Sequence, residues 1–581
     1  MTAKIVLGAA LAAACARAEL PPPPPFSPAG VPAVSTAEPA ANPSSTADLD
    51  VTYIERTPRY DYDAAKNNPA PGDSVTFRGH IRNTGDSPAA SVDYEWRLDD
   101  VPVASGTLTN LAVNEERVVT WGWVWQDGNH WIKLQVDPNN VIGESSEVNN
   151  EVVDRTDGII VGFWVEQSVY DYFHQYQKDL GVGSNSWDDW AQRQMRFWNQ
   201  FSQNAIYPTT PNGVLDRVRI DKIVVVPDGA LPLAGGYPTN HPDLRDKTVD
   251  LMWGFPATLL NGSMYSNHTS ASISNPFYYE GSLLHELGHA RYLIDTYGFD
   301  VHNTSSHHSV QIYEGSVYVA GSSYMPFLAW DEVLYYNKYG KMMSGGYDQG
   351  WSEYDAGALN RIAGQRACCG NYNAPYNIGA FLNDLPANNH LRITDEAGQP
   401  RRGANVRIYQ AVSGPGWYGK TIDNTPDLEF TTDNAGYVLL PRNPFTAGSI
   451  QHNYGIANGI VVVRIAHLDQ IWYRFQEVTD FNIQYWRGNT QDAYYTIALP
   501  GPNETPVSAD FDGDGDVDQE DFGHFQICLT GSGGAIAPGC EDAILDGDTD
   551  VDAADLSIFT SCISGADVPP ADPTCLDLGS L

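Results

Sequence analysis

The segment from Gly281 to Gly298, GSLLHELGHARYLIDTYG, holds two histidines four residues apart, and this spacing strongly constrains the fold around it. Its apolar residues recur with helical spacing, and residues four apart on a helix share one face. His285 and His289 therefore point at one spot, where a third ligand and an open position would suit a catalytic Zn²⁺. Glu286 is placed to act as general base on a water held by the metal. The alternative is a structural or vestigial helix, because so short a motif also occurs by chance.

A zinc site on this helix needs a third protein ligand from farther along the chain. The leading candidate is Asp295, six residues after His289. On a continuous helix Asp295 would rotate away from His289, because six residues are not a whole number of turns. The helix must therefore end early, before the next obvious terminator at Gly298. The alternative third ligands are His302 and then Asp300, Glu314, His307 and His308.

The composition indicates an exported protein of several domains. A chain of 581 residues is expected to form about three to five domains. Its formal charge of −39 argues against nucleic-acid binding and favours a secreted, soluble protein or one that takes up Ca²⁺. Residues 1–18 have the features of a signal peptide cleaved after Ala18; the weaker alternative is a lipoprotein acylated at Cys15. No later apolar run is long enough to span a bilayer, and the remaining cysteines lie in a context that permits disulfides.

Changes in pattern divide the first half of the mature chain. Residues 19–47 form a Pro/Ala-rich linker, and residues 48–156 show short alternating strands separated by turns. Trp121, Trp123 and Trp125 lie two apart on one strand face. They either pack the core of a sandwich or form a ligand platform, and core packing is the preferred interpretation.

Residues 157–385 mix strands with helices and contain the histidine motif, so they form the α/β catalytic candidate. The expected strands are Ile159–Val165, Val218–Val226 and Thr248–Phe255, with a helix capped by Ser186. Strands return in residues 386–502, where no residues have catalytic spacing, and this segment is interpreted as a spacer domain.

Residues 503–581 contain a duplicated acidic loop. The first copy fits the EF-hand pattern, with Gly515 at the sharp turn and oxygen ligands from Asp510, Asp512, Asp514, the Asp516 carbonyl, Asp518 and Asp521. The second copy offers Asp546, Asp548, Asp550, Asp552 and Asp555. There Ile544 occupies the first ligand position and Thr549 replaces the turn glycine, which predicts a weaker or altered site. A disordered acidic tail, the alternative, would not explain the repeat.

Each copy of the acidic loop also carries a cysteine seven residues after its last aspartate, with another cysteine farther on. We expect the disulfides Cys528–Cys540 and Cys562–Cys575, although connectivity stays open from sequence alone. The adjacent pair Cys368 and Cys369 is either a vicinal disulfide or two buried thiols.

Several segments resemble known families. VTFRGHIRNTGD and VDPNNVIGESSEVNN resemble the CARDB-type adhesion module, an immunoglobulin-like β-sandwich, over residues 48–156. HELGHARYLIDTY is similar to the metzincin zinc proteases, especially the secreted immune inhibitor A and snapalysin-like enzymes with an Asp ligand. Those families usually carry Gly where this chain has Tyr292. Residues 386–502 resemble a carboxypeptidase-regulatory-like sandwich, and residues 503–581 resemble a type I dockerin, which implies a cohesin partner.

The metzincin resemblance also extends to KMMSGGY at residues 341–347, which looks like the Met-turn that lies beneath the metal. It assigns Met343 as the Met-turn methionine; the alternative is a core-filling Met pair. Tyr347 or Tyr297 would donate a hydrogen bond to the developing oxyanion, unless both are structural.

Together these features predict a multidomain protein. An α/β (α+β) metzincin-like catalytic domain lies between two all-β sandwiches, followed by a small α-helical dockerin. The implied function is a secreted zinc endopeptidase acting on proteins or glycoproteins, with an extended substrate adding to the strand Thr248–Phe255. One alternative is a non-catalytic surface adhesion protein, but the intact Glu286 argues against it. Another is a glycan-active protein, but no carboxylate pair can be singled out for that chemistry.

Overall fold

The structure is a computed structural model. It describes residues 46–61, 68–171, 186–231, 233–234, 237–238, 246–257, 280–301, 309–310, 313–314, 317–318, 336, 341–344, 350–366, 378–413, 419–450, 458–468, 470–500, 509–512 and 516–566. The chain divides into two compact units, Met1–Gln203 with Arg217–Glu280 and Asn204–Asp216 with Gly281–Leu581. The division falls within the predicted catalytic segment, 157–385. Each unit is described by itself below.

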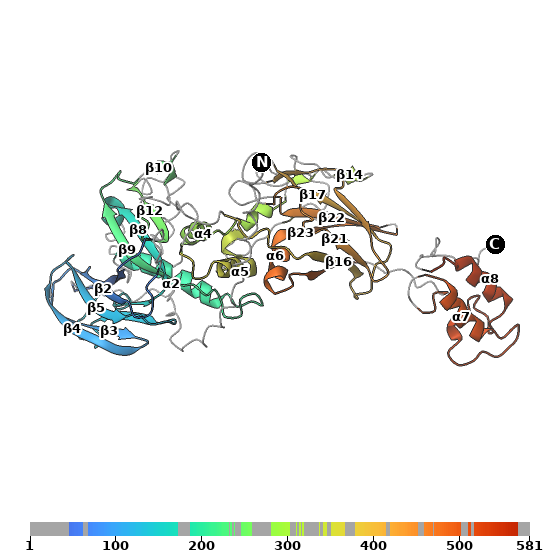
Figure 1. Cartoon of the computed structure of the whole chain (residues 1–581), viewed down its shortest axis with the longest axis horizontal. Coiled ribbons are helices and arrows are strands. Elements are labelled where there is room, and N and C mark those ends of the chain that lie inside the picture. The colour runs from blue at the N-terminus through green and yellow to red at the C-terminus, as the bar shows by residue number, and fades with distance from the viewer. Residues whose placement is uncertain are drawn as a thin grey trace, which may run out of the picture. The chain divides into compact units, whose positions relative to one another are not determined.

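The first unit begins with a two-sheet β-sandwich (Figure 1). One sheet has the order β1-β2-β5, with β1 at Leu49–Thr57, β2 at Ser74–Asn83 and β5 at Glu116–Val124. The other has the order β4-β3-β6-β7, with β3 at Ala89–Leu98, β4 at Val101–Leu111, β6 at Trp131–Val136 and β7 at Glu151–Arg155. Apolar residues from both sheets form one core, so the predicted sandwich is confirmed.

The tryptophan stripe of this sandwich contributes to its core. Trp123 and Trp125 are buried and Trp121 is partly buried against the same core. Their rings follow one another, with centroids 6.3 Å apart for Trp121 and Trp123 and 5.3 Å apart for Trp123 and Trp125. This burial supports the core-packing interpretation over the ligand platform.

The rest of the first unit is a parallel sheet with a helix packed on it. The sheet has the order β12-β8-β9, with β8 at Ile159–Glu166, β9 at Val218–Val226 and β12 at Leu251–Phe255. Helix α2, Trp187–Asn204, begins where the Ser186 hydroxyl accepts a hydrogen bond from the Asp189 amide at 2.9 Å, as predicted. Trp187 and Trp190 of α2 pack edge-to-face on Phe255 of β12. The two-residue strands β10, Leu233–Ala234, and β11, Tyr237–Pro238, form a separate hairpin.

The start of β12 differs from the sequence prediction, which placed it at Thr248. The strand begins at Leu251. The amide and hydroxyl of Thr248 both donate to a carboxylate oxygen of Asp246, at 3.0 and 2.6 Å. This local turn competes with strand pairing for the same backbone.

Buried hydrogen bonds join the sandwich to the parallel sheet and to α2. Ser186 donates to Asp50 Oδ2 at 2.5 Å, and Gln192 Nε2 donates to the Thr52 carbonyl at 2.8 Å. The backbone amide of Arg56 donates to Asp221 Oδ1 at 3.1 Å. Because breaking such contacts would leave buried polar groups without partners, the sandwich and the sheet form a single structural unit.

The second unit contains the histidine motif on α4, Gly281–Ala290, followed by the 3₁₀ helices η3, Thr296–Phe299, and η4, Met342–Ser344, and by α5, Glu353–Arg361. Short strands accompany them: β13 at Ser309–Val310, β14 at Tyr313–Glu314, β15 at Val317–Tyr318, β18 at Val412–Ser413 and β19 at Gly419–Ile422.

Residues 388–499 of this unit form two sheets that share one core (Figure 1). The first has the order β21-β16-β24, with β16 at Asn388–Asp395, β21 at Tyr437–Leu440 and β24 at Asp492–Leu499. The second has the order β20-β17-β22-β23, with β17 at Asn405–Gln410, β20 at Leu428–Thr431, β22 at Ile460–His467 and β23 at Gln470–Glu477. Helix α6, Val478–Trp486, was not predicted. Phe299, Val301 and Tyr354 join the same core, so this sandwich packs with the segment after the histidine motif.

The C-terminal part contains α7, Gln519–Cys528, and α8, Ala553–Cys562, with η6 at Glu541–Ala543 between them. The predicted disulfide Cys528–Cys540 is present. Cys575 lies outside the described residues, so the second predicted disulfide remains a prediction. Phe525 and Phe559, at the same place in each helix, meet in a small core with ring centroids 5.2 Å apart.

Buried carboxyl groups make the stability of the first unit depend on pH. Burial raises the pKa of Asp154 to about 7, of Asp188 to about 6 and of Glu144 to about 8. Each group therefore binds its proton more tightly in the folded chain than in the unfolded chain. Their contribution to stability is present below the unfolded pKa and is lost as the pH rises through these folded values.

We expect the thermal midpoint of the first unit, followed by tryptophan fluorescence, to fall from pH 5.5 to pH 8.5. Asp154→Asn removes one titrating group and should make this fall shallower. The corresponding slope of the free energy of unfolding should decrease by up to about 1.4 kcal/mol per pH unit. Asp127→Asn, at an exposed position of the same unit, should leave the slope as it is. A midpoint that rises over this range would contradict the prediction.

Candidate zinc and calcium sites

The end of α4 determines where the third candidate zinc ligand lies. Tyr292 adopts a left-handed backbone conformation, with φ of 69°. Its amide donates to the His289 carbonyl at 2.9 Å, and the Leu293 amide donates to the Gly288 carbonyl at 3.2 Å. These two bonds are the Schellman motif, which usually places glycine where this chain has Tyr292. The helix thus ends before Asp295 without a glycine, as an Asp295 ligand requires.

Tyr292 is held in this strained conformation by its surroundings. Its side chain is 1% exposed, and its carbonyl accepts a hydrogen bond from the Gly379 amide at 3.0 Å. A bulky residue with positive φ costs on the order of 1–3 kcal/mol, and it persists only where neighbouring contacts determine the backbone.

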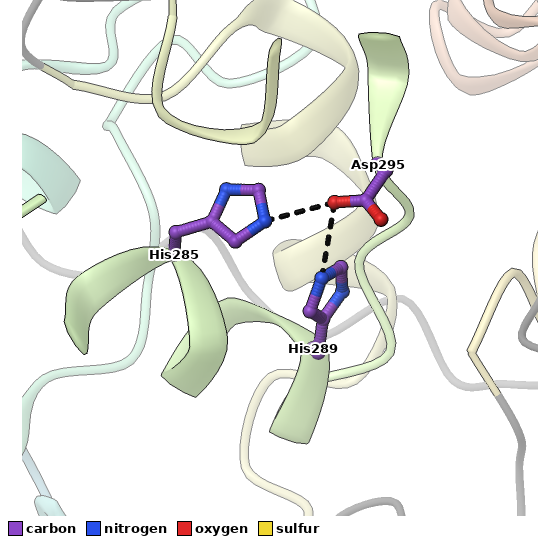
Figure 2. Close-up of side chains that lie close together, drawn as sticks. All are labelled: His285, His289 and Asp295. Carbon is purple, nitrogen blue, oxygen red and sulfur yellow. Dashed lines mark ion pairs between the residues drawn. The ribbon is translucent and has the colours of Figure 1, made fainter. Parts of the chain in front are cut away.

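The turn brings His285, His289 and Asp295 together (Figure 2). Asp295 Oδ1 lies 2.8 Å from His285 Nε2 and 3.1 Å from His289 Nε2. One ligand atom from each residue lies within 4.8 Å of the others. No other described His, Cys, Asp or Glu joins this group.

Backbone carbonyls orient both histidines. His285 Nδ1 lies 2.8 Å from the Met342 carbonyl, and His289 Nδ1 lies 2.8 Å from the Leu293 carbonyl. A carbonyl only accepts, so each Nδ1 is assigned the proton and each Nε2 presents its lone pair to Asp295. Metal-bound histidines are commonly oriented in this way.

The short distances between Asp295 and the two histidines shift the pKa values of Asp295 and His289. Burial would raise the pKa of Asp295, but its interactions with His285 and His289 outweigh burial and hold that pKa below its ordinary value. Burial likewise would lower the pKa of His289, but the nearby Asp295 and Glu286 carboxylates raise it to about 9. The group therefore favours positive charge at its centre, whether from protons or from a metal ion.

Met343 lies directly beneath the histidine helix. Its side chain is fully buried, and a Cβ added at Gly288 would come within 2.8 Å of its sulfur. The neighbouring Met342 supplies the carbonyl that orients His285. Met343 and its neighbour thus contact the histidine helix by packing and by a hydrogen bond, and the Met-turn assignment stays a prediction.

Of the remaining predicted zinc-site residues, some lie in the part of the chain that the structure describes and others lie outside it. Asp300 is buried at the end of η3 and lies outside the ligand group, and Glu314 lies on β14. The Tyr297 ring stacks on the His285 ring with centroids 6.1 Å apart, and Glu286 is partly buried on α4. The candidates His302, His307, His308 and Tyr347, like Cys368 and Cys369, lie outside the described residues.

The acidic loops bring carboxylates together at the predicted spacing. In the first loop one group holds Asp510, Asp512 and Asp521, and another holds Asp516, Asp518 and Asp521. In the second loop the group is Asp546, Asp548 and Asp555. Asp514 and Gly515 lie outside the described residues, and Ile544 packs against the small core instead of offering an oxygen.

Equivalent hydrogen bonds show that the two loops share one backbone arrangement. Asp521 Oδ1 accepts from the amide of Phe511 at 2.6 Å, and Asp555 Oδ1 accepts from the equivalent Leu545 at 2.7 Å. Asp518 and Asp552 cap the helices that follow, which gives them a structural role besides the predicted ligation. Asp550 differs, because its Oδ2 accepts from the Gly533 amide at 2.7 Å. Its carboxylate is thus partly engaged in a contact that the sequence pattern did not predict.

Comparison with known families bears on the N-terminal sandwich. The CARDB family model matches residues 46–154. This segment is a CARDB domain. A crystal structure of a CARDB domain from Pyrococcus furiosus, in complex with di-metal ions, is 21% identical; the match covers 20% of this chain and 94% of that chain, with a TM-score of 0.16. A solution NMR structure of a CARDB domain from Pyrococcus furiosus is also 21% identical, over 19% of this chain and 94% of that chain, with a TM-score of 0.16.

A solution NMR structure of a domain from Methanosarcina acetivorans is 22% identical, over 19% of this chain and 90% of that chain, with a TM-score of 0.16. No curated protein matches the chain. The family model ends at residue 154, and the metzincin and dockerin resemblances remain predictions. None of the described helices is long and apolar enough to cross a membrane.

The contact between Gly288 and Met343 is testable by a double-mutant cycle. Gly288→Ala should lower the thermal midpoint, because overpacking costs about 1–3 kcal/mol against a gain of about 1 kcal/mol in helix propensity. In the background of Met343→Ala the closest remaining contact of the added methyl is Leu293 Cδ1 at 3.3 Å, so the same change should cost less than in the wild type. An equal cost in both backgrounds, measured by calorimetry on the full chain, would show that Met343 does not restrict this position.

Proposed function

We propose that the protein is a secreted zinc-dependent endopeptidase that hydrolyses peptide bonds of proteins or glycoproteins. The observation that supports this most directly is the convergence of three electron-pair donors, His285 Nε2, His289 Nε2 and Asp295 Oδ1, at the helix that also carries Glu286.

The donor set fits zinc. Both Nδ1 atoms face carbonyls, so the two Nε2 atoms have no proton to donate to Asp295 in the neutral imidazole form. Neither carboxylate oxygen of Asp295 has another hydrogen-bond partner among the described residues, although the side chain is 1% exposed. Positive charge between these atoms, from a proton or from a metal ion, relieves the repulsion of the facing lone pairs, and two imidazoles with one carboxylate are a ligand set of catalytic zinc.

Each residue then has a distinct chemical role. Zinc bound by this set would acidify a water molecule and polarise the substrate carbonyl. Glu286 accepts the proton of the attacking water and later gives it to the leaving amine. The carbonyls of Met342 and Leu293 keep both imidazoles in the orientation and tautomer that the chemistry requires. Tyr297, stacked near His285, is a candidate donor to the developing oxyanion.

The role of Glu286 is tested by Glu286→Gln, which keeps the shape of the side chain but removes the base. Hydrolysis of a mixed protein substrate should fall by about 10²- to 10⁴-fold while the zinc content stays at the wild-type level. Unchanged hydrolysis would exclude Glu286 as the base. A wild-type protein that binds no zinc would exclude the enzyme and favour the adhesion alternative.

The third ligand is tested by comparing Asp295→Ala with Asp300→Ala, a matched change at a buried aspartate five residues along. Asp295→Ala should weaken zinc binding by more than the roughly 10- to 100-fold that follows loss of a residue orienting a ligand. Asp300→Ala should keep zinc affinity near that of the wild type. Full zinc affinity in Asp295→Ala would move the third ligand to His302 or another candidate.

We further propose that residues 503–581 bind Ca²⁺ and attach the protein to a cohesin-type module. The support is the duplicated arrangement of carboxylates and of helix caps, together with the Cys528–Cys540 disulfide.

A second candidate function, a non-catalytic surface adhesion protein, is favoured by the CARDB domain alone. It does not account for the convergence of the three donors at a helix that carries an intact Glu286.

A further inference from the structure

The two acidic loops are tied to each other by crossed hydrogen bonds. The amide of Val517, in the first loop, donates to the Ser564 hydroxyl at 2.9 Å, and the Ser564 amide donates back to the Val517 carbonyl at 2.9 Å. Ser564 follows α8, the helix of the second copy. The second copy thus holds the loop of the first.

The reverse contact has the same form. The Val551 amide, in the second loop, donates to the Thr530 hydroxyl at 3.0 Å, and the Thr530 amide donates to the Val551 carbonyl at 2.9 Å. Thr530 follows α7, the helix of the first copy. Thr530 and Ser564 lie 34 residues apart, as do Val517 and Val551, so the repeat places both hydroxyls at one equivalent position.

These bonds act on the segments that carry the cation ligands. Val517 is fully buried between Asp516 and Asp518, and Val551 is fully buried between Asp550 and Asp552. When the backbone of each valine is fixed, the backbone carbonyl of the preceding aspartate and the carboxylate of the following aspartate are also fixed. A loop whose ligands are already fixed loses less conformational entropy when it binds an ion.

The second loop depends more on this support than the first. It has Ile544 where the first loop has Asp510, and its carboxylate group is limited to Asp546, Asp548 and Asp555 among the described residues. With one charged ligand fewer, its intrinsic affinity for a divalent cation is lower.

We propose that Thr530 and Ser564 are positioning residues that couple the two loops, so that Ca²⁺ in the first loop raises the affinity of the second. This inference rests on the proposed calcium loops. An ion in the first loop orders the start of α7 through Asp521, and the far end of α7 leads to Thr530, which holds Val551. The coupling runs equally in the reverse direction, because linkage between two binding sites is reciprocal.

The experiment is a calorimetric titration of the chelator-treated full chain with CaCl₂, with zinc restored beforehand. Thr530→Val replaces the hydroxyl by a methyl of the same size and should weaken binding to the second loop roughly five- to tenfold, as expected for one lost hydrogen bond. Thr530→Ser keeps the hydroxyl and should restore the affinity. The matched control is Thr560→Val, because among the described residues the Thr560 hydroxyl bonds to carbonyls of its own helix alone, at 2.9 and 3.0 Å.

Coupling is separated from simple loop damage by Asp512→Asn, which weakens the first loop. In the wild-type background this change should also lower the affinity of the second loop. In the Thr530→Val background its effect on the second loop should be smaller but not absent, because the Ser564 bonds and the backbone bonds to Val551 still join the loops. Equal effects in both backgrounds, or an unchanged second loop in Thr530→Val, would overturn the coupling while leaving the calcium loops in place. A wild-type chain that takes up no Ca²⁺ in this segment would instead overturn the calcium loops themselves.

Discussion

The turn at Tyr292 is the local feature on which the candidate zinc site depends. A helix that continued past Ala290 would carry Asp295 away from the histidines, whereas the left-handed turn brings its carboxylate within 3.1 Å of both Nε2 atoms. The strain of this conformation at a tyrosine is offset by burial of the ring and by the hydrogen bond from Gly379. Packing around the turn, and not a glycine within it, therefore determines the geometry of the site.

The 3₁₀ helix η4 contacts the histidine helix and supports the site. Gly288 leaves space for the Met343 sulfur, and the Met342 carbonyl orients His285, so one short 3₁₀ helix contributes both packing and a hydrogen bond. Residues close to the turn, Phe299 and Val301, belong to the core of the second sandwich. This sandwich thus packs directly with the segment that carries Asp295. It is therefore more than the spacer domain that the sequence predicted.

The CARDB domain is similarly integrated into its own unit. Contacts from Asp50, Thr52 and Arg56 to α2 and β9 are buried and hydrogen-bonded. A mobile adhesion module would be expected to hang from an exposed linker with few contacts crossing the boundary. In this structure the CARDB domain supports the parallel sheet and its helix.

The sequence by itself determined the features that depend on local spacing. It predicted the helix with His285 and His289 on one face, the strands β8 and β9, the cap at Ser186, the register of both acidic loops and the disulfide Cys528–Cys540. These follow from residue periodicity or from a duplicated pattern, which need no knowledge of distant parts of the chain. The repeat also contained a signal for Thr530 and Ser564, because both stand at one equivalent position.

Only the tertiary structure decided the features that depend on contacts between distant residues. The sequence left Asp295 among several candidates, because a positive φ at a tyrosine depends on neighbours such as Gly379 that are remote in sequence. It missed α6, a nine-residue helix between strands whose burial comes from the surrounding sandwich. It also placed the start of β12 three residues too early, where the Asp246 side chain competes for the backbone. Local patterns identify which residues have the chemistry, but packing between distant segments decides which of them meet.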